Sequence, residues 1–321
     1  MSMPKPMRAG PVRGLLAMLA ALVLASAAPA AAQVNVNELL GGGGDAGVGG
    51  STTSGGGTGA VAPSGDTASR FQQVAKAYEK AVGLVVVVVP DGQGGFRSVP
   101  FGTAWAFAPT LLGTNAHITR PTAQLMERGH QVFVLPNGSR GESHRVVRAV
   151  SHPRYGDPRP NAMGVKPFPN SYDIGVLEVE EPFPATVKLA RPEQIRAVDS
   201  GTPVAFLGFP TERLINSNVN VQNPIATMQT GIVTSISDFF FEDKGPEKNL
   251  LIRHNLPATG GASGSPLFLS DGSVVGALNA GNINMVELTT QEGTDRYRVP
   301  SAAQVNFGMR IDILNDLVRR E

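Results

Sequence analysis

Hydrophobic and polar positions alternate over short distances through most of this chain, and turn-forming residues separate the apolar runs. From about residue 83 to residue 300, short apolar runs recur between Gly, Pro, Asn and Asp residues. Many short strands with such boundaries are typical of an all-β sandwich or barrel. The runs are LVVVVVP, TAWAFAP, QVFVLPNG, RVVRAVSH, DIGVLEVE, PVAFLGFP, GIVTSIS and LFLSDGSVVGALNAG.

Helical spacing replaces this pattern at the two ends of the β-rich region. Near its start, apolar residues recur at helical spacing, which predicts a short amphipathic helix. Near its end, the segment RIDILNDLVRR has an apolar face and closes with arginines, and it predicts a C-terminal helix over about 309–320. The apolar positions of the first helix are Phe71, Val74, Ala75, Tyr78 and Val82.

Residues 1–32 have the pattern of a targeting segment. A basic stretch precedes the apolar run LLAMLAALVLASAAPAAA, and Ala30-Ala31-Ala32 supplies the small residues of a cleavage site. We therefore expect a cleaved signal peptide and export to the periplasm or out of the cell. The alternative is an uncleaved anchor helix, because the run approaches the length that spans a membrane.

The next segment, 33–66, is expected to be a disordered Gly/Ser-rich linker. Its part GGGGDAGVGGSTTSGGGTGAVAPSGD has almost nothing to bury, and ordering glycine is costly. The remaining 255 residues, 67–321, are sufficient for two small barrels side by side. We expect the first barrel at about 82–185 and the second at about 186–300.

Composition excludes several classes of chemistry. The chain has no cysteine, which removes disulfides, thiolate metal sites and cysteine nucleophiles. Its net charge is +1 and becomes −2 without residues 1–32, so no nucleic-acid partner is expected. No HExxH or other metal-ligand spacing appears, and neither a metal nor a cofactor is predicted.

The stretch TGGASGSPLF (259–268) has the composition of a turn that presents a serine. Asp271-Gly272, just after it, is a favoured two-residue turn and predicts a β-hairpin. Ser263 precedes the first arm, next to glycines that can adopt backbone angles closed to other residues. Such a turn can aim successive N–H groups at one anion and would stabilise the oxyanion of an acyl transfer. The alternative is a flexible Ser/Gly connection.

A serine nucleophile needs a base, and the base needs an orienting group. His117 ends the apolar segment TAWAFAPTLLGTNAHI, which is expected to form a hairpin that delivers the imidazole from a strand end. Asp173 opens an otherwise apolar strand, and because a buried carboxylate without a partner is costly, we expect it to hold a histidine N–H. His130, His144 and His152 are interpreted as surface or turn histidines.

Together these motifs resemble those of the trypsin-like (chymotrypsin-fold) serine proteases, in the broad group of the bacterial HtrA and glutamyl endopeptidase proteases. TNAHI, YDIGVL and GASGSP match the family's motifs at His117, Asp173 and Ser263. The order His, Asp, Ser is that of the family. The resemblance spans about 82–318, without a visible PDZ domain, and implies an all-β, two-barrel fold with a catalytic triad between the barrels.

The resemblance also implies an oxyanion hole and a substrate-binding strand. By the same matching, the N–H groups of Gly261 and Ser263 would bind the oxyanion. The segment Asn279-Ala280-Gly281 would pair with the substrate backbone beside the S1 pocket.

The specificity of that pocket is less well defined by the motifs. The family's pocket-floor position aligns with Pro257, so no acid favours Lys or Arg, and a small or medium apolar P1 residue is expected. The alternative is an acidic P1 residue recognised by His254, although related glutamyl enzymes have a histidine where this chain has Asn279. Ala262 replaces the aspartate of many zymogen-activated relatives, so activation by a newly cut N-terminus is not expected.

These features predict an exported serine endopeptidase that acts on protein or peptide substrates through an acyl-enzyme. No stable membrane span is expected if the leader is cleaved. The alternative is a catalytically silent binding or scaffold protein of the cell envelope that retains the fold.

Overall fold

The computed structural model describes residues 65–156, 159–210, 220–258, 260–280, 283–289, 296–302 and 305–318. The predicted leader (1–32) and almost all of the predicted linker (33–66) lie outside these residues and stay predictions. Within the described ranges, no helix is both long enough and apolar enough to cross a membrane.

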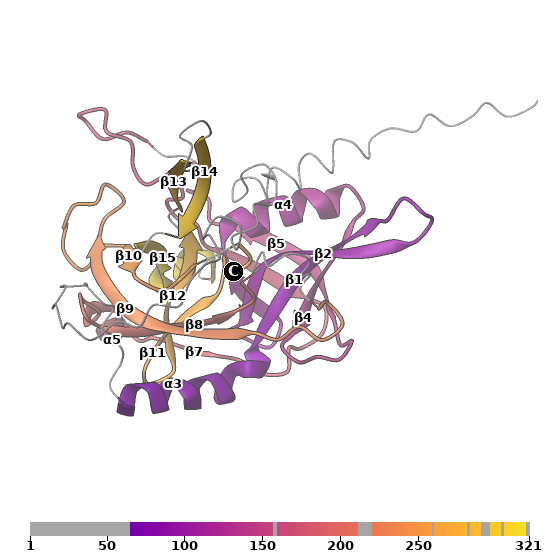
Figure 1. Cartoon of the computed structure of the whole chain (residues 1–321). Coiled ribbons are helices and arrows are strands. Elements are labelled where there is room, and N and C mark those ends of the chain that lie inside the picture. Colours follow the sequence, from indigo (N-terminus) through magenta and orange to yellow (C-terminus); the bar gives the residue numbers. More distant parts are fainter. Residues whose placement is uncertain are drawn as a thin grey trace, which may run out of the picture. The chain divides into compact units, whose positions relative to one another are not determined.

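The valine-rich run that follows Ala81 forms the first strand of a closed antiparallel barrel (Figure 1). This strand, β1 (Val82–Pro90), is buried from Val82 to Val87, as expected for β-branched side chains in a strand covered on both faces. It pairs with β2 and β4, and the strand order around the barrel is β1-β2-β3-β6-β5-β4. The other strands are β2 (Phe96–Ala106), β3 (Leu111–Thr114), β4 (Gln131–Pro136), β5 (His144–Ser151) and β6 (Gly175–Val179).

A second antiparallel barrel follows along the chain. Its strands have the order β11-β8-β9-β10-β15-β12, the pairing of β11 with β12 closes the ring, and β7 adds to β12 in parallel. The hairpin predicted at Asp271-Gly272 is confirmed, since β11 and β12 pair across that turn. The strands of this sheet are β7 (Lys188–Leu189), β8 (Pro203–Gly208), β9 (Thr227–Ser237), β10 (Leu251–His254), β11 (Pro266–Leu269), β12 (Ser273–Ala280) and β15 (Asn306–Arg310). A separate two-stranded sheet pairs β13 (Ile283–Thr289) with β14 (Arg296–Ala302).

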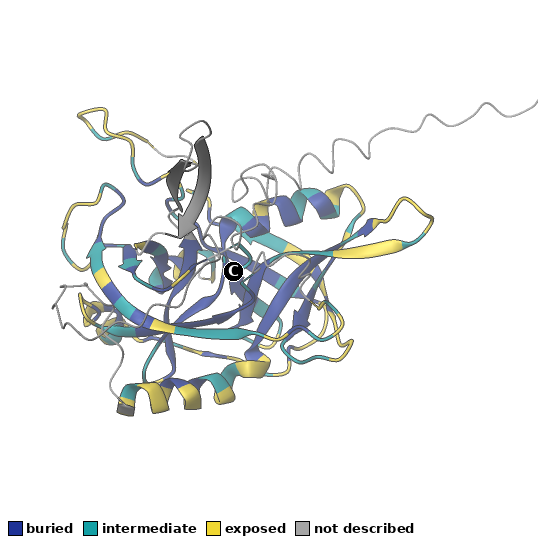
Figure 2. Ribbon diagram, in the orientation of Figure 1, coloured by how far each residue is buried: buried dark blue, intermediate teal, exposed yellow. Residues whose placement is uncertain are grey.

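Two six-stranded barrels with a short helix at each end confirm the predicted all-β, chymotrypsin-like architecture. The N-terminal helix α3 (Gly65–Tyr78) buries Phe71 and Val74 and exposes its opposite face (Figure 2). The ring of Tyr78 stacks on buried Phe268, with centroids 5.4 Å apart. Aromatic pairs of this kind add to the stabilisation from buried apolar area, so α3 is attached to the second barrel by packing.

The C-terminal segment differs from the prediction at its start. The predicted helix begins at about 309, but 306–310 is strand β15, because Met309 pairs with Leu251 of β10 and with Ala277 of β12. Hydrogen-bonded pairing of this segment with strands on both sides therefore outweighs the helical spacing of its apolar residues. The chain then continues as η2 (Ile311–Leu314), a 3₁₀ turn with buried Ile311, and α6 (Asn315–Val318).

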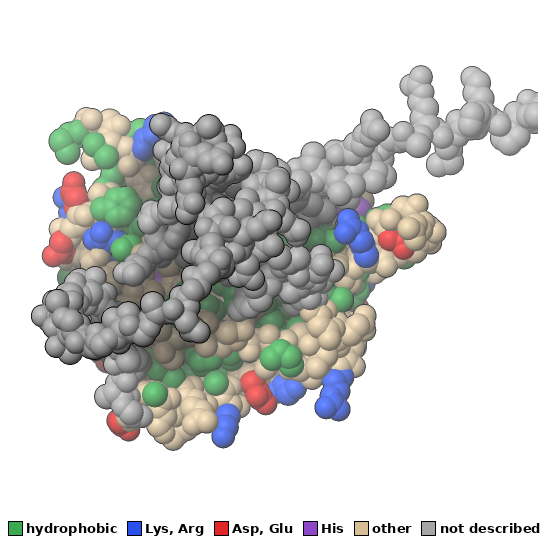
Figure 3. All heavy atoms as spheres, in the orientation of Figure 1, with side chains coloured by type: hydrophobic (Ala, Val, Ile, Leu, Met, Phe, Trp, Pro, Cys, Tyr) green, Lys and Arg blue, Asp and Glu red, His purple; other side chains and the backbone are tan. Residues whose placement is uncertain are grey.

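Charged side chains are dispersed over the described surface that is visible in Figure 3. Lys and Arg lie among Asp and Glu, separated by apolar and neutral groups (Figure 3). This distribution agrees with the small net charge of the sequence.

Candidate active site

His117 lies in the first turn of a helix, α4 (Ala116–Glu127), that the sequence reading did not predict. The predicted hairpin is confirmed, since β2 pairs with β3, but the predicted place of His117 at a strand end is wrong. Strand β3 ends at Thr114, and Asn115 caps the helix with extended backbone angles. The side-chain amide of Asn115 donates to the carbonyl oxygen of Asp173 at 2.9 Å, which ties the start of α4 to the segment before β6.

The structure brings His117 and Asp173 together through two hydrogen bonds. The imidazole Nδ1 lies 2.6 Å from Asp173 Oδ2, and the backbone N–H of His117 donates to Oδ1 at 2.7 Å. Asp173 is fully buried, whereas 28% of the His117 side chain is exposed. Because an ionised carboxylate can only accept, Nδ1 carries the proton and Nε2 is the basic nitrogen of the neutral ring.

The pKa of His117 is raised above its ordinary value of 6.5 by the balance of two opposing effects. Burial lowers the pKa because it disfavours the charged imidazolium. The negative charge of Asp173 and its hydrogen bond to the ring favour the imidazolium, and together they outweigh burial. The pair can thus accept a proton at Nε2 and stabilise the charge that results.

A constrained turn positions the Asp173 carboxylate. Tyr172, directly before it, has a φ of +56°, in the left-handed region that non-glycine residues seldom adopt. The N–H of Ile174 donates to the carbonyl of Tyr172 at 2.8 Å, so Asp173 occupies the apex of a three-residue turn. Such strain concentrates at functional positions that their surroundings over-determine.

Ser263 lies on a glycine-rich turn of the second barrel that packs directly on the first. Thr103 of β2 holds this turn: its hydroxyl donates to the Gly261 carbonyl at 2.9 Å, and its N–H donates to the Ser263 carbonyl at 2.9 Å. Gly261 and Gly264 have φ values of +83° and +85°. A Cβ on Gly264 would lie 2.2 Å from the Thr103 carbonyl oxygen, so only glycine fits there.

The same turn also contacts the beginning of the α4 helix. A Cβ on Gly264 would lie 3.3 Å from Cδ1 of Ile118, the neighbour of His117. Close packing at one glycine therefore brings the serine turn against the segment that carries the imidazole.

Two backbone donors of the serine turn are available. Among the described residues, the N–H groups of Gly261 and Ser263 donate to no other group. N–H groups two residues apart in a turn with a left-handed residue can form an anion-binding concavity. This arrangement is compatible with the predicted oxyanion role of both residues, which stays a prediction.

The Ser263 hydroxyl is directed to the second barrel rather than to the imidazole. Its Oγ donates to the carbonyl oxygen of Asn279 at 3.3 Å, the one hydrogen bond that the described structure gives it. The chain therefore brings His117 and Asp173 into direct contact and leaves Ser263 without a hydrogen bond to that pair.

The predicted substrate-binding residues have different surroundings. Buried Asn279 receives a side-chain hydrogen bond from Asn170 at 3.4 Å and donates to the Asn170 carbonyl at 3.2 Å. Ala280 ends β12, and Gly281 lies outside the described residues. Pro257 is exposed, so no contact assigns it to a pocket floor, and its role stays a prediction.

His254, the alternative specificity residue, is fully buried at the end of β10. Neither ring nitrogen has a hydrogen bond of good geometry to a described group. Burial lowers the pKa of His254 to about 4, only partly opposed by the backbone of Phe307. The imidazole is therefore neutral in the folded protein at neutral pH.

This buried imidazole predicts a loss of stability in acid. The unfolded chain binds a proton at His254 near pH 6.5 but the folded chain only near pH 4, so the free energy of unfolding falls as pH drops through that window. We expect protonation of His254 to lower the free energy of unfolding by about 3 kcal/mol between neutral pH and pH 4. The His254→Leu variant should not show this part of the acid loss. Chemical denaturation of both proteins across this pH range measures the difference; equal acid losses would contradict the prediction.

Two other histidines correct the sequence reading. The sequence predicts surface or turn positions for His144 and His152, yet both are buried. His144 contacts the ring of Phe183, and His152 stacks on Tyr172 with centroids 5.0 Å apart. Aromatic partners in the fold cover these imidazoles, and sequence spacing does not reveal such partners.

Three positioning residues were missed by the sequence reading. Thr103 holds the serine turn, Asn170 holds Asn279, and Tyr172 supplies the strained backbone before Asp173. Tyr172 lies inside the quoted YDIGVL motif, but a left-handed tyrosine has no sequence signature. Thr103 and Asn170 act across long sequence separations.

A two-barrel fold with a His–Asp pair beside a glycine-rich serine turn defines a trypsin-like peptidase domain. The sequence model of the trypsin-like peptidase domain family matches residues 102–276, more than half of the chain. The chain therefore belongs to this family.

Similar solved structures include HtrA-type proteases. The HtrA-type protease AlgW with a decapeptide has 14% sequence identity and a TM-score of 0.48, and the match covers 78% of this chain and 66% of that one. The same protease with a tripeptide has 16% identity and a TM-score of 0.48, and the match covers 78% and 62% of the two chains. This chain thus spans slightly less than two thirds of the AlgW chains.

The structure of Deg5 is similar over nearly its whole length. It has 16% identity and a TM-score of 0.47, and the match covers 77% of this chain and 91% of that one. No curated protein matches the sequence.

Proposed function

We propose that this protein is an exported serine endopeptidase in which Ser263, His117 and Asp173 form the catalytic triad. The observation that carries the proposal is the His117–Asp173 pair, bonded at 2.6 Å, with the Ser263 turn packed against the same helix start. The two free N–H groups at Gly261 and Ser263 add the electrostatic component that acyl transfer needs.

In this mechanism, His117 Nε2 removes the hydroxyl proton while Ser263 Oγ attacks the peptide carbonyl carbon. The resulting oxyanion accepts hydrogen bonds from the N–H groups of Gly261 and Ser263. The imidazolium then protonates the leaving amine, and the acyl-enzyme remains. Water, deprotonated by the same nitrogen, hydrolyses the ester and restores Ser263. Asp173 keeps the proton on Nδ1 throughout.

The hydroxyl has to rotate before the reaction begins. At rest it donates to the Asn279 carbonyl, on the strand that we expect to pair with the substrate backbone. A substrate N–H bound to that carbonyl competes for the same oxygen and favours rotation of the hydroxyl toward Nε2. Substrate binding and nucleophile activation are thereby linked through one acceptor.

The raised pKa of His117 predicts the pH dependence of hydrolysis. Only the neutral imidazole can act as the base, so kcat/KM should fall tenfold for each pH unit below the pKa of the free enzyme. We expect the midpoint of the acidic fall in kcat/KM to lie above pH 6.5, because Asp173 stabilises the imidazolium and so raises the pKa of His117. A pH profile with a peptide substrate tests this, and a midpoint at or below 6.5 would argue against it.

Export, and protein or peptide substrates, are part of the same proposal. Export is supported by the sequence pattern of residues 1–32, and peptide substrates by membership in the peptidase family. The competing function is a silent binding protein with the same fold, and the resting Ser263–Asn279 hydrogen bond is the observation that favours it. Probe labelling at Ser263 without cleavage of any member of a peptide library would favour that alternative.

A further inference from the structure

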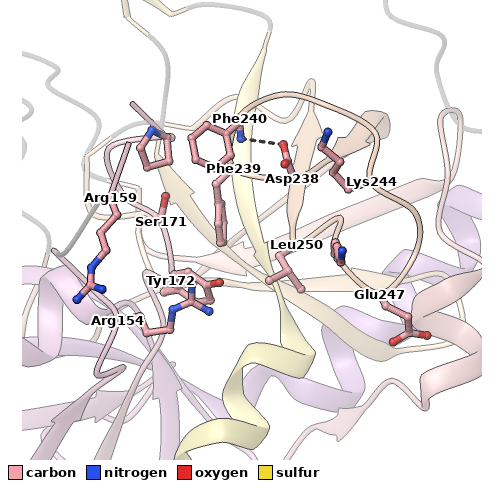
Figure 4. A pocket seen from close by; sticks show the side chains of 12 residues that line it. Arg154, Arg159, Ser171, Tyr172, Asp238, Phe239, Phe240, Lys244, Glu247 and Leu250 are labelled. Atoms are coloured by element: carbon pink, nitrogen blue, oxygen red, sulfur yellow. Dashed lines mark hydrogen bonds between the residues drawn. The ribbon is translucent and has the colours of Figure 1, made fainter. Parts of the chain in front are cut away.

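A cavity of about 610 Å³ lies next to the segment that precedes Asp173 (Figure 4). Its walls come from that segment, within 154–172, and from the connection between β9 and β10, within 238–250. The volume is in the range of sites for small molecules and short peptide segments. No residue of the proposed triad lines it, although Tyr172, directly before Asp173, does.

The floor of the cavity is apolar and held in place. The rings of Tyr172 and Phe239 meet edge to face, with centroids 4.7 Å apart. The Tyr172 ring is already contacted by the Arg154 guanidinium and the His152 imidazole. Phe239 is buried, so the half-buried side chains of Phe240 and Leu250 supply the apolar surface open to a ligand. The N–H of Phe168 donates to the carbonyl of Phe239 at 2.6 Å and joins the two segments.

The rim is basic. Arg154 and Arg159 lie on one side and Lys244 on another, as Figure 4 shows, and Lys248 also lines the cavity. All four are exposed. The guanidinium carbon of Arg154 lies 3.9 Å from the centroid of the Tyr172 ring, so this cation sits directly over the floor.

The lining of the cavity has two acidic residues against four basic ones. Asp238 Oδ1 accepts the backbone N–H groups of Phe240 and Glu242, at 2.8 and 2.9 Å. Glu247 pairs with Arg196, outside the cavity, at 2.9 Å. The cavity thus keeps a surplus of positive charge.

Only part of the basic rim is already paired. Lys244 has an acidic partner, Glu242 at 2.5 Å. Arg154 and Lys248 form no ion pair with any residue that the structure describes. Because Arg154 also contacts the ring and hydroxyl of Tyr172, Lys248 is the more available of the two to a ligand.

We propose that this cavity binds an acidic peptide segment with an aromatic side chain between its carboxylates. The apolar floor suits the aromatic ring, and basic groups on separate sides suit carboxylates on separate residues better than one small anion. Because Tyr172 forms the floor and directly precedes Asp173, occupancy shifts the environment of the His117–Asp173 pair. The binding itself does not depend on the proposed hydrolysis.

The binding test uses the full chain with Ser263→Ala, which prevents turnover. Calorimetry compares acetyl-Glu-Phe-Glu-amide with acetyl-Gln-Phe-Gln-amide and with citrate. We expect the acidic peptide to bind at least about tenfold more tightly than either comparison ligand, and more weakly as salt rises. Equal affinity of the two peptides, or no binding up to about millimolar concentration, would overturn the proposal. Citrate binding as tight as that of the acidic peptide would overturn the peptide assignment.

Variants locate the site. Combined Arg154→Gln and Lys248→Gln should weaken the acidic peptide at least about tenfold, and Arg154→Lys with Lys248 intact should weaken it less. Lys76→Gln, at an exposed position of α3, is the matched control and should change nothing. Thermal unfolding checks that each variant folds. Unchanged affinity in the folded double variant contradicts the location.

The consequence for the neighbouring pair is measured by NMR on the Ser263→Ala protein. The imidazole signal of His117 should shift as the acidic peptide saturates the cavity, and the shift should vanish in the Arg154→Gln, Lys248→Gln background. An unchanged signal at saturation would refute the effect on the pair. Because neither measurement requires catalysis, failure of the proposed hydrolysis would leave both results interpretable.

Discussion

Replacing Ser263 by alanine is expected to lower kcat for peptide hydrolysis by about 10⁴- to 10⁶-fold, because no other hydroxyl can form the acyl-enzyme. The free N–H groups of the turn are main-chain atoms and persist in the variant, so a small residual rate above water is expected. Casein cleavage and a chromogenic peptide assay measure the loss.

The same turn offers a matched control for this substitution. Ser265, two residues further on, is buried, and its hydroxyl has no hydrogen-bond partner among the described groups. Ser265→Ala therefore removes an equivalent hydroxyl without removing an interaction and should keep kcat near the wild-type value. Undiminished hydrolysis by Ser263→Ala, or an equal loss in both variants, would refute the role of Ser263.

Replacing Asp173 by asparagine is expected to lower kcat about 10⁴-fold. The side chain of asparagine has nearly the same shape, but its amide can donate to Nδ1 and favour the tautomer that carries the proton on Nε2. That nitrogen then has no lone pair with which to accept the hydroxyl proton. The peptide assay measures kcat, and circular dichroism checks the fold.

An exposed carboxylate provides the control for the Asp173 change. Asp199 is exposed and accepts a hydrogen bond from the backbone N–H of Ser200. Asp199→Asn should leave kcat unchanged. A folded Asp173→Asn protein with a loss below about tenfold would show that Asp173 does not orient the base.

Local sequence signals predicted the features that depend on a few neighbouring residues. Asp271-Gly272 requires a tight turn, and the β11–β12 hairpin forms across it. The alternation of short apolar runs and turns predicted an all-β sandwich or barrel, and the family resemblance predicted two barrels in which His117 and Asp173 meet. The turn and the strand pattern depend on a short window of sequence, and the meeting of the two site residues was inferred from the family resemblance.

Features that depend on partners distant in the chain could not be predicted from the sequence. Helix α4 follows β3 directly, with apolar residues that read equally well as strand. The apolar spacing near residues 306–310 is helical, but these residues pair with two strands. The burial of His152 depends on the ring of Tyr172, which stacks on it. The cavity on the connection between β9 and β10 has no motif at all, because its walls come from segments far apart in the chain.

The chemical identity of the nucleophile is the claim on which the proposed function rests. Treating the purified wild-type protein with a fluorophosphonate, digesting it and sequencing the modified peptide by mass spectrometry tests that claim most directly. We expect a single adduct on the oxygen of Ser263, and we expect it to be lost when His117 is replaced by alanine. An adduct on another residue, or no adduct after prolonged exposure of folded protein, would contradict it.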